Sequence, residues 1–132
     1  MNGIIITVDF DGTITTHEFP EIGKDIGALP ILKKLTDKGH KLILNTMRSD
    51  KKGDRATLTE AVEYLKKNGI ELYGIGENPT QKSWTDSVKP HSNLNIDDIN
   101  LGSPLKYDPS ISDRPYVDWV KVEKMLTEYG LI

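Results

Sequence analysis

The sequence predicts an α/β fold in three layers, with a mostly parallel β-sheet covered by helices on both faces, in one domain that spans residues 1–132. Short apolar runs alternate along the chain with segments of helical periodicity, and the joining segments are short. Strands that alternate with helices in this way pair in parallel, and the connecting helices cover the sheet. A chain of 132 residues is long enough to bury one hydrophobic core.

Four apolar runs are predicted to be strands, at residues 4–8, 41–46, 70–73 and 94–96. A first helix is expected from about Leu29, or somewhat earlier, with Gly39 as its C-cap. The other two helices are predicted from apolar residues at helical spacing: Leu58, Ala61, Val62 and Leu65, ending near Gly69, and then Val122, Met125, Leu126 and Tyr129.

The composition limits the classes of function. Hydrophobic residues make up 36% of the chain and charged residues 28%, as in ordinary soluble globular proteins. A net charge of −3 argues against a general nucleic-acid or membrane surface. The absence of cysteine excludes disulfides, thiol nucleophiles and cysteine-ligated metals. No run approaches the length of a membrane span or a signal peptide, so a cytoplasmic location is expected.

Polar residues follow three of the predicted strands. They are Asp9 and Asp11 after the first, Thr46 and Arg48 after the second, and Asp97 and Asp98 after the fourth. Parallel strands end at a common edge of the sheet, and ligands of α/β proteins bind beyond that edge. We therefore expect these three groups to converge on one site.

The segment Asp9-Phe10-Asp11-Gly12-Thr13 has the strongest chemical signal in the chain. Two carboxylates crowded at the end of a strand repel each other unless a cation or a shared proton lies between them. Carboxylate oxygens at such a turn suit Mg²⁺. A turn rich in aspartate that merely closes the strand is the alternative interpretation.

Taken together, these residues resemble the motifs of the haloacid dehalogenase superfamily of phosphatases over nearly the whole chain. The first motif is Asp9 to Thr13, the second is Thr46, and the fourth is Asp97-Asp98. The third motif is a lysine, either Lys89 or Lys82. The pattern Ser87-Val88-Lys89 before Ile96-Asp97-Asp98 is similar to that of small capless members, which favours Lys89.

The resemblance implies a Rossmann-like fold and a Mg²⁺-dependent phosphomonoester hydrolase that forms an aspartyl-phosphate. Asp9 would be the nucleophile and Asp11 the general acid and base. Mg²⁺ would be held by Asp9, the backbone carbonyl of Asp11, and Asp97, with Asp98 in or just outside the coordination shell.

The resemblance also assigns phosphate-binding roles. Thr46 and Lys89 would hold the phosphoryl oxygens. Arg48 follows the second motif closely, and we expect it to contact either the substrate phosphate or Asp50. The three histidines His17, His40 and His91 lack the spacing of metal ligands, so we expect them at the surface.

The connections between the motifs are too short for a cap domain, which predicts an open site with only the 15–23 segment above it. Such a site would admit a phosphate on a macromolecule, or a small metabolite if a second subunit of a homo-oligomer supplied the lid. A phosphotransferase and a non-catalytic, receiver-like module that binds Mg²⁺ and phosphate are the alternatives. Receivers carry an aspartate after the third strand, and none follows Tyr73-Gly74 here.

Overall fold

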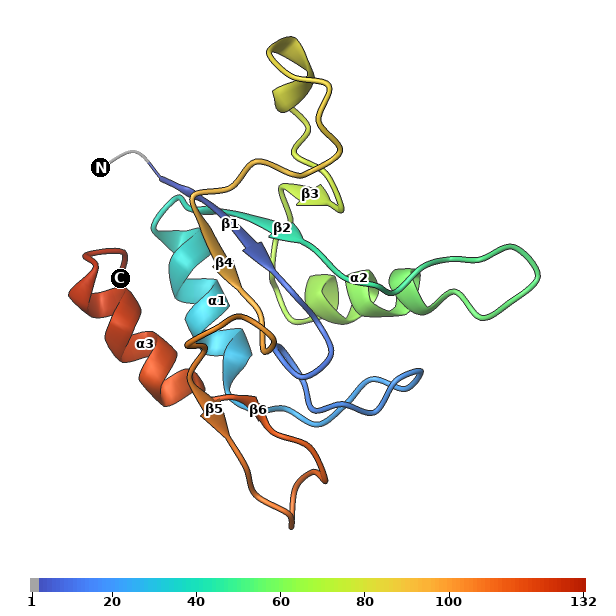
Figure 1. Cartoon of the computed structure of the whole chain (residues 1–132), viewed down its shortest axis with the longest axis vertical. Helices are drawn as coiled ribbons and strands as arrows, with labels where there is room; N and C mark the ends of the chain where they lie inside the picture. Colours follow the sequence, from blue (N-terminus) through green and yellow to red (C-terminus); the bar gives the residue numbers. More distant parts are fainter. Residues whose placement is uncertain (1–2) are drawn as a thin grey trace.

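A computed structural model describes residues 3–132, with a four-stranded parallel sheet in the order β3-β2-β1-β4 (Figure 1). The strands are β1 (Ile5–Val8), β2 (Lys41–Leu44), β3 (Gly74–Ile75) and β4 (Leu94–Ile96). The helices are α1 (Ala28–Asp37), α2 (Thr57–Lys67) and α3 (Trp119–Glu128). The predicted parallel α/β arrangement is confirmed. No helix within residues 3–132 combines the length and the apolar character that crossing a bilayer requires.

The hydrophobic core lies between one face of the sheet and the helices. Alternate strand positions point to the same face, and Ile6, Val8, Leu42, Leu44 and Ile96 form one cluster with the buried side chains of all three helices. α1 packs against both β2 and α3. The three helices therefore cover a single face.

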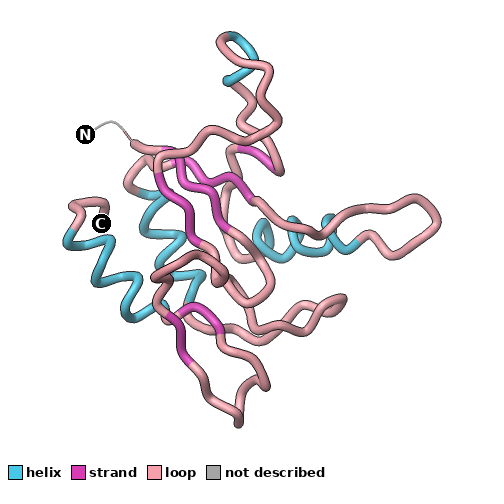
Figure 2. The backbone as a smooth tube through the Cα atoms, viewed as in Figure 1, coloured by secondary structure: helices cyan, strands magenta, loops and turns pink. Residues whose placement is uncertain are grey.

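The prediction of helices on both faces is wrong for the described part of the chain. Thr7, Ile43 and Asn95 lie side by side on the opposite face, where Thr7 Oγ1 lies 3.1 Å from Ser92 Oγ. The segment 76–93 covers this face, and Figure 2 shows it as loop apart from one short turn, η1 (Gln81–Ser83). Its two large apolar side chains, Trp84 and Val88, are both exposed, so the segment buries no apolar stripe of a helix.

The third strand was expected at residues 70–73 but pairs with β2 at Gly74–Ile75. The apolar residue that suggested the earlier start, Ile70, packs in the core without joining the ladder. Gly74 is required where it stands, because a Cβ there would lie 2.1 Å from the carbonyl oxygen of Glu77. An antiparallel pair that the sequence did not predict, β5 (Leu105–Lys106) and β6 (Tyr116–Val117), follows β4.

Candidate active site

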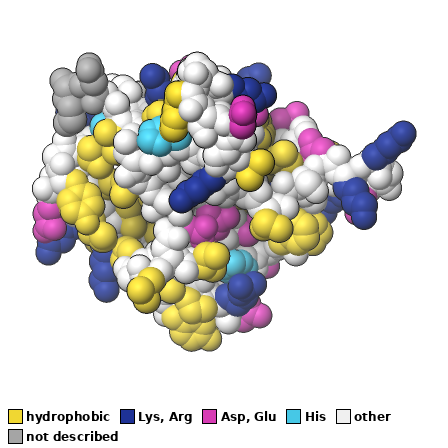
Figure 3. Space-filling view, turned by 45° about the horizontal axis from the view of Figure 1, so that its top comes forward, with side chains coloured by type: hydrophobic (Ala, Val, Ile, Leu, Met, Phe, Trp, Pro, Cys, Tyr) yellow, Lys and Arg dark blue, Asp and Glu magenta, His cyan; other side chains and the backbone are white. Residues whose placement is uncertain are grey.

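Three acidic side chains meet at the carboxyl edge of the sheet. Asp9 follows β1, and its backbone N–H continues the ladder by donating to the carbonyl of Ile96 at 3.0 Å. Asp97 and Asp98 follow β4, and one carboxylate oxygen from each of the three residues lies within 4.8 Å of the others. Figure 3 shows acidic side chains gathered at the centre of one face with a basic side chain next to them. The predicted convergence of these three aspartates is present.

The turn after Asp9 holds this acidic cluster, Asp9/Asp97/Asp98, in place. Thr13 Oγ1 donates to Asp9 Oδ2 at 2.9 Å and accepts from the backbone N–H of Asp98 at 3.0 Å, so one hydroxyl links β1 to β4. The turn is supported from the C-terminal third of the chain. The N–H of Val117 in β6 donates to the Gly12 carbonyl at 3.0 Å, and the indole of Trp119 donates to the Thr13 carbonyl at 2.6 Å.

The cluster is short of positive charge. Burial, together with the charge of Asp97, raises the pKa of Asp9 to about 7. Burial also raises the pKa of Asp97, and the neighbouring Asp98 adds to the effect. Carboxylates crowded in this way repel each other, and a divalent cation between them removes the repulsion. Oxygen-only donors are what Mg²⁺ and Ca²⁺ take, so the residues present fit such an ion.

His17 joins the cluster and was missed at the sequence level. Its Nε2 lies 2.9 Å from Asp98 Oδ2, and the two side chains are only 14% and 10% exposed. Gly12, at φ +80°, makes room for the ring, because a Cβ there would lie 1.9 Å from His17 Nε2. Ligand spacing could not reveal His17, since it reaches the site through a tight turn.

The other two histidines differ from each other. His40 is 5% exposed, so its expected surface position is wrong. Its ring accepts from the N–H of Ile4 at 3.1 Å and contacts the Leu131 carbonyl at 2.8 Å. His91 is exposed, as expected.

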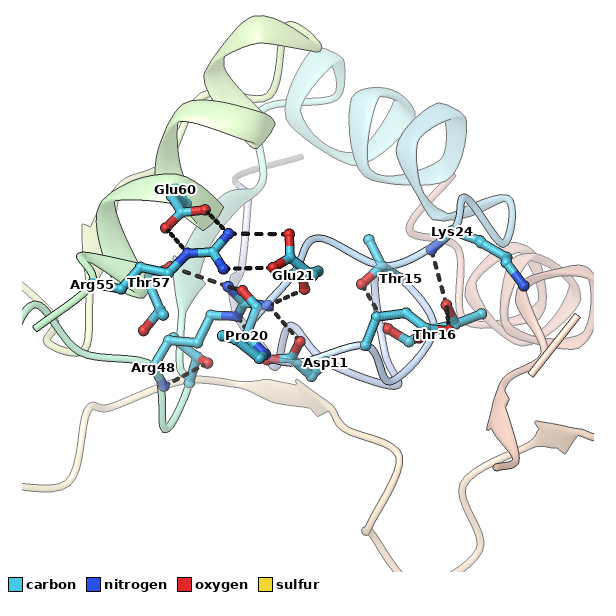
Figure 4. A network of polar contacts seen from close by, with 12 residues as sticks. Asp11, Thr15, Thr16, Pro20, Glu21, Lys24, Arg48, Arg55, Thr57 and Glu60 are labelled. Carbon is cyan, nitrogen blue, oxygen red and sulfur yellow. Dashed lines mark hydrogen bonds and ion pairs between the residues drawn. The ribbon is translucent and has the colours of Figure 1, made fainter. Parts of the chain in front are cut away.

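Asp11 lies apart from the acidic cluster and is clamped by Arg48 (Figure 4). Arg48 Nε and Nη2 donate to the two carboxylate oxygens of Asp11, both at 2.8 Å. The remaining N–H groups donate to the carbonyls of Pro20, Glu21 and Thr57 at 3.2, 2.8 and 3.2 Å. A guanidinium has five N–H groups, so the buried Arg48 is fully used in this arrangement and offers none to a phosphate.

The expected alternative contact of Arg48, with Asp50, is not formed. Asp50 instead accepts from the backbone N–H of Thr59 in α2 at 2.9 Å. Arg48 links Asp11 to the 17–23 segment and to the start of α2. A second arginine strengthens this link at the surface, where Arg55 bridges Glu21 at 2.6 Å and Glu60 at 2.7 Å (Figure 4).

The two expected phosphate ligands keep free donors. Thr46 Oγ1 accepts the N–H of Arg48 at 3.1 Å, which leaves the proton of the hydroxyl itself available. Lys89 is exposed and forms no ion pair within residues 3–132. Lys89 lines a hollow of about 550 Å³ together with Thr7 and Asn95. Thr7 and Asn95 precede Asp9 and Asp97 by two positions, so they lie on the same face of the sheet as these aspartates.

Lys82 does not line that hollow. It lies on η1, within the segment that crosses the sheet, and its side chain is exposed. Lys89, and not Lys82, therefore lies beside the two strands that lead to the acidic cluster.

The fold and this site define an α/β protein with a candidate metal centre at the carboxyl edge of a parallel sheet. No protein-family model matches the chain, and no curated protein matches it either. It is similar to a solved structure described as a conserved protein coded by a locus from Bacteroides thetaiotaomicron, with 32% identity and a TM-score of 0.75 over 97% of this chain and 93% of that chain. The chain belongs to the family of that conserved protein.

Proposed function

We propose that the chain is a Mg²⁺-dependent phosphomonoester hydrolase of the haloacid dehalogenase type. The observation that carries the proposal is the meeting of Asp9, Asp97 and Asp98 within 4.8 Å at the carboxyl edge of the sheet. The pKa of Asp9, raised first by burial and then by the charge of Asp97, adds support, because strongly shifted pKa values cluster at functional sites.

The metal is assigned to the acidic cluster, with Asp9 and Asp97 as ligands and Asp98 in or next to the coordination shell. The backbone carbonyl of Asp11 is the remaining protein ligand that we propose. When bound, the ion supplies positive charge that offsets the repulsion between a carboxylate nucleophile and a phosphate. His17 and Thr13 hold Asp98 and Asp9 in orientation.

Asp9 is the proposed nucleophile. Its carboxylate attacks phosphorus, the bond from phosphorus to the leaving oxygen breaks, and an aspartyl-phosphate remains. Asp11 would enter the reaction protonated, give that proton to the leaving oxygen, and later take one from the water that hydrolyses the intermediate. The Arg48 clamp at 2.8 Å fixes the position of the Asp11 carboxylate, and each carboxylate oxygen keeps a further lone pair for proton transfer.

Thr46 and Lys89 are the proposed ligands of the phosphoryl oxygens, since both have donors that the described residues do not use. The site is also proposed to be of the capless type. The connection from β1 to β2 holds α1, that from β2 to β3 holds α2, and that from β3 to β4 holds only η1. A phosphorylated substrate in a cytoplasmic setting remains our prediction, and its identity is addressed below.

The test is hydrolysis of p-nitrophenyl phosphate by the wild type and by Asp9→Asn, with Mg²⁺ and with EDTA. We expect activity only for the wild type with Mg²⁺. Asp37→Asn is the matched control, because Asp37 lies at the end of α1 and is 64% exposed beside Lys33. Activity in Asp9→Asn above a few per cent of wild type would overturn the assignment of the nucleophile.

Asp11→Asn tests the second carboxylate separately. This variant should retain the nucleophile and accumulate phosphoenzyme, because the step that needs a base is slowed. Full activity with no accumulated intermediate would remove Asp11 from the mechanism. Transfer of the phosphoryl group to added alcohols in place of water would identify a phosphotransferase.

A further inference from the structure

The exposed aromatic ring of Phe19 contacts the guanidinium of Arg48, which in turn contacts Asp11. The centroid of the Phe19 ring is 5.2 Å from the guanidinium carbon of Arg48, and the centroid of the Phe10 ring is 4.9 Å from the same atom. Arg48 is in turn held by Asp11 at 2.8 Å. The ring of Phe19 therefore rests on a fixed support, and the residue is nevertheless 61% exposed.

A second exposed apolar side chain stands on the same side. Met47 is 97% exposed and lies in the chain between Thr46, a proposed phosphate ligand, and Arg48. Phe19 and Met47 line one hollow of about 340 Å³, together with Ser49, Lys51 and Thr57. Large side chains so exposed next to a proposed reaction centre are a feature of ligand-binding surfaces.

This hollow, which we term the Phe19 hollow, is placed where a leaving group would emerge. In the proposed reaction, Asp11 protonates the leaving oxygen, so the rest of the leaving group must lie on the Asp11 side of the phosphate. The Phe19 hollow meets that side through Arg48. The other hollow near the site, lined by Trp84 and Lys89, lies on the sheet face of Thr7 and Asn95.

We infer that the Phe19 hollow binds the base of a nucleoside monophosphate, an inference that rests on the proposed function. Every nucleobase has a flat π-face that stacks on an aromatic side chain. Phe19 is 61% exposed, so its ring leaves area free for such stacking. The two charged lining residues that form no ion pair within residues 3–132, Lys51 and Asp54, have opposite signs, which suits an uncharged base.

The test compares adenosine 5′-monophosphate with ribose 5-phosphate, which has a hydroxyl in place of the base. Wild type should show a kcat/KM about tenfold or more higher for the nucleotide, since base stacking is worth roughly that factor. Phe19→Ala should remove most of this preference by raising KM for the nucleotide, with little change for ribose 5-phosphate. Phe19→Tyr, which retains the ring, should restore the preference.

Trp84→Ala is the matched control, because Trp84 is also an exposed aromatic residue, at 63% exposure. It should keep the preference for the nucleotide. Equal kcat/KM for the two substrates in the wild type would overturn the inference. So would a loss of preference in Trp84→Ala, or an equal loss for both substrates in Phe19→Ala.

Binding without turnover separates this inference from the proposed function. If neither substrate nor p-nitrophenyl phosphate is hydrolysed, the hydrolase proposal fails and the Phe19 hollow is judged by calorimetry with adenosine 5′-monophosphate. Binding that weakens about tenfold in Phe19→Ala would support the base site. Binding that is absent, or equal in Phe19→Ala and wild type, would overturn it.

Discussion

Asp9 and Asp11 stand two positions apart in the chain and have opposite surroundings. Asp9 faces Asp97 and Asp98, and burial together with the charge of Asp97 raises its pKa to about 7. Asp11 receives two hydrogen bonds of 2.8 Å from Arg48. The fold thus supplies a counter-charge to one acid and leaves the other to obtain one from outside. In our account that outside charge is Mg²⁺.

The separation of the two acids comes from the backbone between them. Along a continuing strand they would point to the same face, but the chain turns at Phe10, whose carbonyl accepts the N–H of Ile14 at 2.8 Å. Phe10 itself is fully buried and packs edge-to-face on Tyr64, with ring centroids 5.9 Å apart. The turn sends Asp9 toward β4 and Asp11 toward α2.

Removing the counter-charge of Asp11 should have the largest effect on stability. Arg48→Met should lower the free energy of unfolding by about 3–5 kcal/mol, because it leaves a half-buried carboxylate and three carbonyls without their donors. Urea denaturation measures the change. Arg48→Lys should recover only part of it, since an ammonium cannot make the two-pronged contact.

A double-mutant cycle that combines Arg48→Met with Asp11→Asn measures the coupling between Arg48 and Asp11 directly. The two substitutions should be strongly non-additive, because each one already breaks the pair. Additive losses would mean that Arg48 stabilises the fold through Pro20, Glu21 and Thr57 alone.

The next effect concerns Lys89, which lines the hollow beside Thr7 and Asn95. Lys89→Ala should lower kcat/KM by about 10²–10³, roughly 3–4 kcal/mol, as loss of one preorganised donor to the phosphate does. Lys82→Ala is the matched control and should stay near wild type in steady-state hydrolysis. The reverse result would move the third motif to Lys82.

The uncompensated charge at Asp9 should be visible in the pH dependence of stability without metal. The raised pKa of Asp9 means that between about pH 4 and 7 the folded protein binds more protons than the unfolded chain. The free energy of unfolding in EDTA should therefore fall as pH rises through this window, by on the order of 1–3 kcal/mol.

Mg²⁺ should reverse that loss and stabilise the protein more at pH 8 than at pH 4.5, since protons compete with the ion at low pH. Thermal melts with Mg²⁺ and with EDTA measure both effects. Asp9→Asn should flatten the pH dependence in EDTA. A wild-type protein whose stability in EDTA is constant from pH 4 to 7 would contradict the account of the cluster.

Substitution of His17 should have the smallest effect, which we expect on Mg²⁺ affinity. His17→Ala should weaken Mg²⁺ binding about tenfold, because partners of metal ligands orient them, while kcat at saturating Mg²⁺ changes little. Calorimetric titration of Mg²⁺ gives the affinity without turnover. His91→Ala, at an exposed position, should bind as wild type does; equal affinity in all three proteins would leave His17 without a role at Asp98.

The parts of the molecule that sequence could predict are those with local signals. Strand ends carry their polar residues within a few positions of an apolar run, so the sequence predicts that Asp9, Asp97 and Asp98 meet. The burial of Arg48 was not predictable in this way. Its partners come from the turn after β1, the 17–23 segment and α2, and only the tertiary fold brings them together.

Two further differences have physical causes. The alternation of strands and helices predicts a helix on the second face of the sheet. The 76–93 segment crosses that face instead, because the chain must pass from β3 at one edge of the sheet to β4 at the other, and this crossing does not require a helix. The β5–β6 pair contains only Leu105–Lys106 and Tyr116–Val117, too few residues for an alternating pattern to stand out. That pair nevertheless supports the turn at Gly12.

The most direct test of the central claim is the location of the covalent intermediate. Wild type and Asp11→Asn are mixed with substrate and Mg²⁺, quenched in acid within the first turnover, and digested for peptide mass spectrometry. We predict one phosphoryl group on Asp9, with a larger amount in Asp11→Asn. A phosphoryl group on another residue, or turnover with no covalent label in either protein, would contradict the account.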